Sequence, residues 1–229
     1  MDELLQNFLE ETDPGKVMDF AVSLSCRDHA DDVPVLIEAL KDKEEIRRLG
    51  AVYALGYSRR EPRVVIPLMN VLLDPAETVR IRSQAAEFLG RLQHRRAIKA
   101  LIRCSRDSSS DLRFWCVFAL GQITAVRRKR LTRAGIRALE VRVLDYGWPE
   151  EGGWWPIRFE ALAMLDRKSP EYSRIYREEL TRVLADPIAN AELWPWASTY
   201  ATAEEMNGAI EMIAAAGLDP VTLGQSRVL

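Results

Sequence analysis

Apolar residues in the middle of the chain recur at steps of three and four positions, and polar residues fill the intervals between them. This spacing is typical of an amphipathic α-helix, whose apolar side chains gather on one face. We expect short apolar helices at residues 33–40, 65–72, 97–102 and 135–141. The sequence lacks the alternation of apolar and polar residues that indicates a β-strand. The pattern therefore predicts an all-α fold.

A phrase of ten residues follows each of these helices. The four copies read RRLGAVYALG at 47–56, IRSQAAEFLG at 81–90, LRFWCVFALG at 112–121 and IRFEALAMLD at 157–166. Their last positions are 34, 31 and 45 residues apart. Such self-similarity indicates a solenoid, in which neighbouring copies bury apolar faces that no single copy can bury alone.

The order of these parts resembles a known repeat. A proline-containing apolar helix, an acidic turn and then aliphatic-Arg-x-x-Ala-Ala-x-x-Leu-Gly is similar to the HEAT repeat in its short, bilin-lyase-type form. The resemblance covers residues 33–166 and extends to the flanks in outline, and the fourth copy departs from it by carrying Asp166 where glycine is usual. It implies a right-handed α-solenoid, an α-α superhelix of about five to six HEAT-like helix pairs.

We expect residues 1–229 to form a single solenoid. Its predicted parts are N-terminal capping helices at 1–32, clear repeats at 33–166 with an inserted loop at 145–156, and a degenerate repeat with a capping helix at 167–229. Pro195 is expected to interrupt a helix over residues 190–200. Residues 203–216 should form a helix that ends at Gly217.

An arginine occupies the second position of every phrase. The four are Arg48, Arg82, Arg113 and Arg158. The favoured interpretation is structural, because in HEAT-like repeats such an arginine usually ties an acidic turn residue to the next copy. The turns carry suitable partners in Asp42, Asp74 and Asp107. Contact with a ligand is the alternative.

Aromatic residues cluster where the second helices are predicted to face the concave side. If the Ala-Ala/Leu face packs inward, the positions three, six and seven before the end of each phrase point to that side. The residues predicted to bind a partner there are Tyr53, Arg113, Phe114, Trp115, Phe118, Arg158 and Phe159. Exposed aromatic surface tends to mark binding. The alternative is that the C-terminal helices or the inserted loop cover these rings.

The inserted loop is the second unusual element. It carries Trp148, Trp154 and Trp155, and Gly152-Gly153 permits a sharp reversal of the chain. Loops inserted in repeat proteins often lie on the binding face. The three tryptophans are therefore candidates for a ligand contact, with a structural plug as the alternative.

Charge is distributed unevenly behind a net value of −2. Residues 91–142 hold 14 basic and 3 acidic residues, whereas the segments on either side are acidic. The densest cations are Arg127, Arg128, Lys129, Arg130, Arg133 and Arg137. Such a patch fits nucleic-acid phosphates or an acidic partner, and a solvated loop is the alternative.

No catalytic or metal-binding motif is present. His29 and His94 lie far apart, and the sequence lacks a serine elbow, a phosphate-binding glycine loop and a zinc pattern. We therefore expect no enzymatic activity, no cofactor and no metal. Cys26, Cys104 and Cys116 lie in apolar stretches and are expected to be buried thiols.

No apolar run reaches the roughly 18–20 residues that cross a bilayer, and the N-terminal segment is acidic where a secretory signal is basic. We expect a cytoplasmic protein without a membrane partner. The leading hypothesis is a non-enzymatic scaffold that binds a protein segment or helix. Binding of nucleic acid by residues 91–142, as in HEAT-like alkylpurine DNA glycosylases, is the alternative. The repeat subtype also implies a bilin lyase-like subunit, which ranks lowest.

Overall fold

The computed structural model describes residues 3–26, 31–57, 61–125, 133–150, 155–166 and 170–224. In these ranges the regular elements are thirteen α-helices and three 3-10 helices, and no strand is present. The predicted all-α solenoid class is confirmed. Within the same ranges, no helix is both long enough and apolar enough to cross a membrane. The chain divides into two compact units, residues 1–135 (unit 1) and 136–229 (unit 2).

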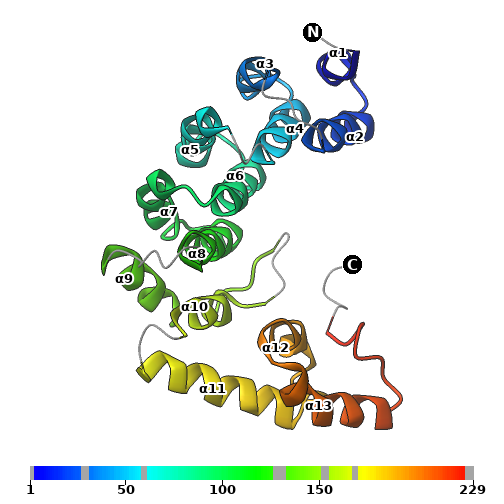
Figure 1. Ribbon diagram of the computed structural model, residues 1–229, viewed down its shortest axis with the longest axis vertical. Coiled ribbons are helices and arrows are strands. Elements are labelled where there is room, and N and C mark those ends of the chain that lie inside the picture. The colour runs from blue at the N-terminus through cyan, green and yellow to red at the C-terminus, as the bar shows by residue number, and fades with distance from the viewer. Residues whose placement is uncertain are drawn as a thin grey trace. The chain divides into compact units, whose positions relative to one another are not determined.

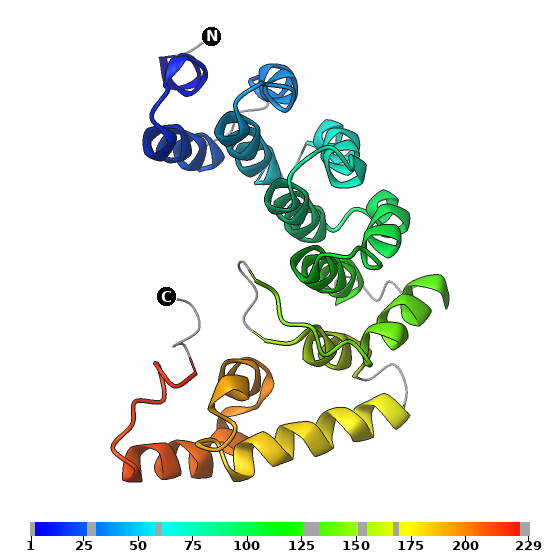
Figure 2. The same cartoon turned by 180° about the vertical axis from the view of Figure 1, so that it is seen from behind.

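Unit 1 is a stack of helix pairs in two layers (Figures 1 and 2). Its helices are α1 (Glu3–Glu10), α2 (Pro14–Ser25), α3 (Val33–Ala39), α4 (Glu45–Gly56), α5 (Val65–Leu73), α6 (Val79–Leu92), α7 (Ile98–Cys104) and α8 (Ser110–Ala125). We call α3, α5 and α7 the first-helix layer and α2, α4, α6 and α8 the second-helix layer. The short helices η1 (Pro62–Val64) and η2 (Arg95–Ala97) lead into α5 and α7.

Local sequence signals fix where these helices begin. The Asp13 side chain accepts a hydrogen bond from the Lys16 backbone N–H, and Pro14 occupies the first turn of α2. Thr78 caps α6 in the same way through the Ile81 backbone N–H. Consecutive copies then bury a continuous apolar interior, whose largest members in unit 1 include Phe8, Leu24, Leu36, Leu55, Leu68, Phe88 and Phe114.

Unit 2 is organised around the long helix α11 (Pro170–Ala185), which contacts α10 (Ile157–Leu165), α12 (Trp194–Tyr200) and α13 (Ala203–Ala215). The helix α9 (Arg133–Arg142) crosses the boundary between the units, and η3 (Ala191–Leu193) precedes α12. As expected, no continuous α-helix spans residues 190–200. The α-helix begins at Trp194, and Pro195 lies in its first turn, where its missing N–H costs little. The helix predicted at the C-terminal side is confirmed as α13. It is followed by Gly217 at φ 73°.

The structure corrects one of the three thiols. Cys104 and Cys116 are buried, as predicted, whereas Cys26 is exposed after the end of α2. A single solenoid spanning the whole chain stays a prediction, since each unit is compact by itself.

Candidate interaction surface

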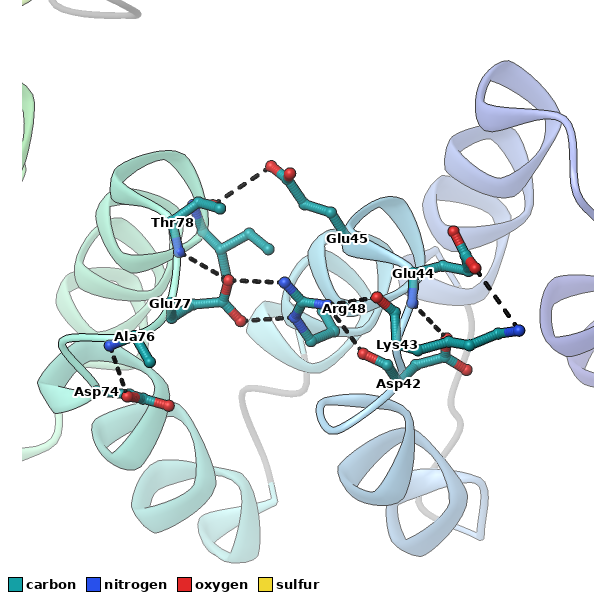
Figure 3. Close-up of polar contacts among 10 residues, drawn as sticks. Asp42, Lys43, Glu44, Glu45, Arg48, Asp74, Ala76, Glu77 and Thr78 are labelled. Carbon is teal, nitrogen blue, oxygen red and sulfur yellow. Dashed lines mark hydrogen bonds and ion pairs between the residues drawn. The ribbon is translucent and has the colours of Figure 1, made fainter.

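The phrases found in the sequence form the second helix of each pair, and an arginine ladder joins their turns. Figure 3 shows its first step. Arg48 donates through Nε and Nη2 to the two carboxylate oxygens of Glu77, at 2.7 and 3.0 Å. Its Nη1 donates to the carbonyl oxygens of Asp42 and Lys43. The hydrogen bond to Glu77 raises the pKa of Arg48. This guanidinium therefore holds the turn before α4 against the turn before α6.

The arrangement recurs in the second copy. Arg82 Nε donates to the carbonyl oxygen of Leu72 at 3.2 Å, and Nη2 donates to Asp107 Oδ2 at 3.0 Å. Arg113 donates to the carbonyl oxygens of Asp107 and Ser108. Each arginine thus satisfies carbonyl groups near the end of a first helix or in the turn that follows it, where they have no partner within the helix.

Unit 2 contains a further step of the ladder. Arg158 donates through Nη1 to the carbonyl oxygen of Val143 at 2.6 Å and through Nη2 to Glu179 Oε1 at 3.1 Å. Like Arg48 and Arg82, it connects a carbonyl group on its N-terminal side with a carboxylate further along the chain.

The predicted ladder is confirmed at Arg82, whose carboxylate partner is Asp107. The other predicted acidic partners are wrong. Asp42 contributes its carbonyl group to Arg48, while the Asp74 side chain accepts from the Ala76 backbone N–H inside its own turn. Glu77, three residues later, takes the place that Asp74 was expected to fill.

The closing glycines, which are the last residues of the phrases in α4 and α6, set the distance between neighbouring second helices. A Cβ atom on Gly56 would overlap the ring of Phe88 on α6. A Cβ atom on Gly90 would lie 2.6 Å from the Cα atom of Ala119 on α8. Glycine is therefore required at both positions because the helices approach each other closely there.

Side chains that remain partly accessible on α4, α6 and α8 occupy equivalent positions relative to these glycines. The positions are three and six residues before the glycine and, for Gly56 and Gly90, the residue directly after it. We call this set the second-helix surface. Its partly accessible members are Tyr53, Tyr57, Gln84, Arg91, Trp115 and Phe118, and it includes Glu87, which is buried at 9% exposure.

The α4 and α6 parts of the second-helix surface meet around the buried ring of Phe88. The rings of Tyr53 and Tyr57 each lie 5.3 Å from that ring, centroid to centroid. The guanidinium carbon of Arg91 lies 5.8 Å from the centroids of both Tyr57 and Phe88. A hydrogen bond to Tyr57 and partial burial raise the pKa of Tyr53. The cation thus rests on an aromatic platform.

The polar part of the surface is internally neutralised. Glu87 accepts from Arg91 Nε at 2.8 Å and from Gln84 Nε2 at 2.6 Å. On α8, the rings of Trp115 and Phe118 lie 5.5 Å apart in an edge-to-face arrangement. The surface therefore presents two aromatic rows separated by one ionic row.

Comparison with known proteins supports the repeat assignment. Residues 81–107, which span α6, η2 and α7, match the family model of the PBS lyase HEAT-like repeat. The chain carries a HEAT-like repeat. The matched segment contains the second step of the arginine ladder, from Arg82 to Asp107. No curated protein matches the chain.

Three solved structures are similar to the chain at low identity. An engineered protein is 17% identical, with a TM-score of 0.49 over 95% of this chain and 99% of that chain. The complex of CpcE and CpcF of phycocyanin lyase from Nostoc sp. PCC7120 is 19% identical, with a TM-score of 0.45 over 85% and 94%. YibA from Escherichia coli is 18% identical, with a TM-score of 0.42 over 100% and 91%.

The HEAT-like copies show which predicted surface residues point inward. The position seven before the end of the phrase is buried in every copy, at Leu49, Ser83, Phe114 and Phe159. Phe114 and Phe159 are 1% and 5% exposed, so their rings do not present a surface. The prediction of exposure was wrong for these two because the position belongs to the apolar stripe that packs on the neighbouring helices. Tyr53, Trp115 and Phe118 remain partly accessible.

In the fourth copy the equivalent surface is covered, which is the alternative that the sequence left open. Trp196 of α12 packs on Phe159 with ring centroids 4.8 Å apart. Trp155, at the end of the inserted loop, and Tyr200, at the end of α12, lie 5.9 Å apart. These rings enclose Glu160, six positions before the end of the phrase, which is 0% exposed.

Glu160 is a buried acid held by two aromatic donors. Its Oε2 accepts from Trp155 Nε1 at 2.9 Å and from the Tyr200 hydroxyl at 3.0 Å. Burial raises the pKa of Glu160 to about 7, although both hydrogen bonds oppose the shift. The Trp196 Nε1 nearby is buried and has no hydrogen-bond partner among the described residues. The carboxyl group thus fastens the inserted loop and α12 to α10.

The remaining candidates separate by location. Trp155 is buried and plugs the fourth copy, Trp148 is half-buried, and Trp154 lies outside the described residues. Among the basic candidates, Arg133 and Arg137 are exposed on α9. Arg127, Arg128, Lys129 and Arg130 lie outside the described residues.

Two residues of the second-helix surface were missed by sequence reasoning. Tyr57 and Arg91 both follow a closing glycine directly, so one repeat position contains them. That shared position is the signal that could have found them. Their role depends on Phe88, whose buried ring brings them together across α4 and α6.

Proposed function

We propose that the chain is a HEAT-like repeat scaffold without enzymatic activity, and that unit 1 binds a protein partner on the second-helix surface. The observation that carries the proposal is the register of partly accessible rings along the second-helix layer, with Tyr53 on α4, Tyr57 directly after it, and Trp115 and Phe118 on α8. Aromatic side chains and arginine are the residues that most often dominate the binding energy of protein interfaces.

The chemistry of the surface favours a protein over a polyanion. Arg91 is the cation of the central row, and Glu87 neutralises it at a distance of 2.5 Å. A polyanion would find no net positive charge there, whereas a protein segment can place apolar side chains on the two aromatic rows and polar groups on the ionic row.

The size of the surface matches a short helix. Neighbouring packed helices lie about 8–10 Å apart, so the rows on α4 and α8 are separated by roughly 20 Å. A partner helix rises about 1.5 Å per residue and would cover that distance with about 13 residues. Anchors at both ends of such a helix would contact Tyr53 and Trp115.

Site-specific photo-crosslinking tests the proposal. A photoreactive amino acid at Gln84 lies between the aromatic rows, and the same group at Asn70, exposed on α5, is the matched control. The proposal expects one protein to be crosslinked from position 84 and not from position 70, in cell extract and again after purification of both components. Equal crosslinking from the two positions would contradict it.

A bilin lyase-like role is the second candidate, supported by the family to which residues 81–107 are matched. Covalent transfer of a bilin to an acceptor protein in the presence of the purified chain, detected as visible absorbance on a denaturing gel, would favour that role. Its absence together with a crosslink from Gln84 would favour the scaffold.

A further inference from the structure

The exposed side of α7 and η2, in the first-helix layer, carries a row of cations. They are Arg95, Arg96, Lys99, Arg103 and Arg106, all exposed. The opposite side of α7 packs into the interior through Ile98, Leu101 and Cys104. Steps of three and four residues place Arg96, Lys99 and Arg103 on one helical face, with Arg95 beside Arg96 and Arg106 in the turn after α7. At about 1.5 Å per residue they extend over roughly 16 Å.

These cations are not neutralised by the described residues around them. None of the five forms an ion pair with any residue in the described ranges, whereas most other arginines of the ranges do. The adjacent helix α5 exposes Ile66 and Asn70, which carry no charge. The first carboxylate that follows the row, Asp107, is already bound to Arg82.

An unneutralised row of this kind raises the electrostatic potential and favours a polyanion. A protein interface would need an aromatic or apolar centre to supply binding energy, and the row contains no such residue. A membrane surface would favour apolar side chains interleaved with the cations for insertion, and these are also missing from the row. Phosphate groups require cations alone, and four of the five side chains are arginines, whose planar fork suits phosphate oxygens.

We propose that the exposed face of η2 and α7 binds the phosphate backbone of nucleic acid without reading its sequence. This site lies in the layer opposite to the second-helix surface and is independent of the function proposed for that surface. The row lies within residues 91–142, for which the sequence left nucleic-acid binding open, and it precedes their densest cations at 127–137.

Fluorescence anisotropy with labelled duplex DNA of about 20 base pairs and with single-stranded RNA of similar length tests the site. Five phosphate contacts predict that the logarithm of the duplex affinity falls with the logarithm of salt concentration with a slope of about −4.5. Neutralising three cations in R95Q/K99Q/R103Q should reduce the magnitude of this slope by about 2.7. The independent variant R96Q/R106Q should reduce it by about 1.8.

The matched control is R174Q/R177Q/R182Q on α11, which removes three exposed arginines that already have carboxylate partners in Glu178, Glu205 and Glu179. This variant should retain the wild-type slope. All variants are compared by thermal unfolding, since exposed substitutions should change stability by no more than about 0.5 kcal/mol.

Three results would overturn the proposal. The first is no binding of either nucleic acid at about 50 mM salt, where phosphate contacts are strongest. The second is an equal loss in the α11 control, which would assign binding to net charge. The third is equal competition by poly-glutamate or by anionic vesicles at matched charge, which would assign the row to an acidic protein or a membrane.

Discussion

The buried carboxyl group of Glu160 makes the stability of unit 2 depend on pH, and the substitution Glu160→Gln measures that dependence. Glu160 is completely buried, and its pKa in the folded chain is about 7 against a reference of 4.5. Since the folded state binds the proton more tightly, the stabilisation is fully present below pH 4.5 and is lost as the pH rises to about 7. A shift of 2.5 units at 1.36 kcal/mol per unit corresponds to about 3 kcal/mol.

Glutamine keeps the size of the side chain and remains neutral at every pH. Its carbonyl oxygen can accept from Trp155 or Tyr200, and its amide group can donate to the hydroxyl oxygen of Tyr200. We therefore expect the stability of E160Q relative to the wild type to increase by about 3 kcal/mol between pH 4.5 and pH 8. The comparison between the two proteins cancels the contribution of carboxylates whose pKa is lowered, such as Glu205.

Urea unfolding followed by tryptophan fluorescence is the assay. Five of the six tryptophans belong to unit 2, so the signal reports mainly on the unit that contains Glu160. The urea midpoints of the wild type and E160Q are measured at several pH values between 4.5 and 8. The slope of the free energy of unfolding against urea concentration must be the same for both proteins. A stability difference that does not change with pH would refute the reasoning, because it would mean that Glu160 has the same pKa in the folded and unfolded chain.

Three further predictions follow from the packing. Gly90→Ala should destabilise unit 1 by about 1–3 kcal/mol because its Cβ meets the Ala119 backbone. Gly208→Ala, in α13 with open space around it, should instead stabilise unit 2 by about 0.5–1 kcal/mol. Chemical denaturation measures both changes in the free energy of unfolding, and changes of the same sign would contradict the account. Arg82→Met leaves the partly buried Asp107 without its guanidinium partner and should lower the free energy of unfolding by about 1–3 kcal/mol. Adding Asp107→Asn should recover part of that loss. If the two substitutions had additive effects on the free energy of unfolding, the coupling between Arg82 and Asp107 would be refuted. Tyr200→Phe should remove one hydrogen bond from Glu160 and thereby raise the pKa of Glu160 further. The loss of this hydrogen bond should lower the free energy of unfolding by about 1 kcal/mol above pH 7. Titration of the Glu160 carboxyl resonance by NMR tests the direction of the pKa change.

The sequence predicted those features that the chain repeats. Four copies of one phrase were sufficient to predict stacked helix pairs and the arginine at the second position, and three of the copies share the glycine at the end, because each feature recurs for the same packing reason. The ladder partner of Arg48 was not predictable in this way. Asp74 and Glu77 lie in the same turn, and which carboxylate reaches the guanidinium depends on the backbone of that turn, where Asp74 binds the Ala76 N–H.

The aromatic residues show where local pattern stops being informative. Phe114 and Trp115 are adjacent in the sequence, yet one is buried and the other is partly accessible, because successive residues of a helix point in directions about 100° apart. The closure of the fourth copy depends on Trp155, Trp196 and Tyr200, which lie up to 40 residues from Glu160. Their assembly results from the path of α11 and α12, which no local spacing encodes.

The central claim is that unit 1 binds a protein through the rings of its second-helix surface. The most direct test measures the affinity of the crosslinked partner for two variants with alanine substitutions. Trp115→Ala with Phe118→Ala removes the two partly accessible rings of α8, and Ile66→Ala, exposed on α5, is the control. The account predicts that the double variant still unfolds cooperatively but binds at least 30-fold more weakly, on the basis of about 2 kcal/mol for one anchor residue, while the control binds like the wild type. Unchanged affinity in a folded double variant, or loss of cooperative unfolding, would contradict the claim.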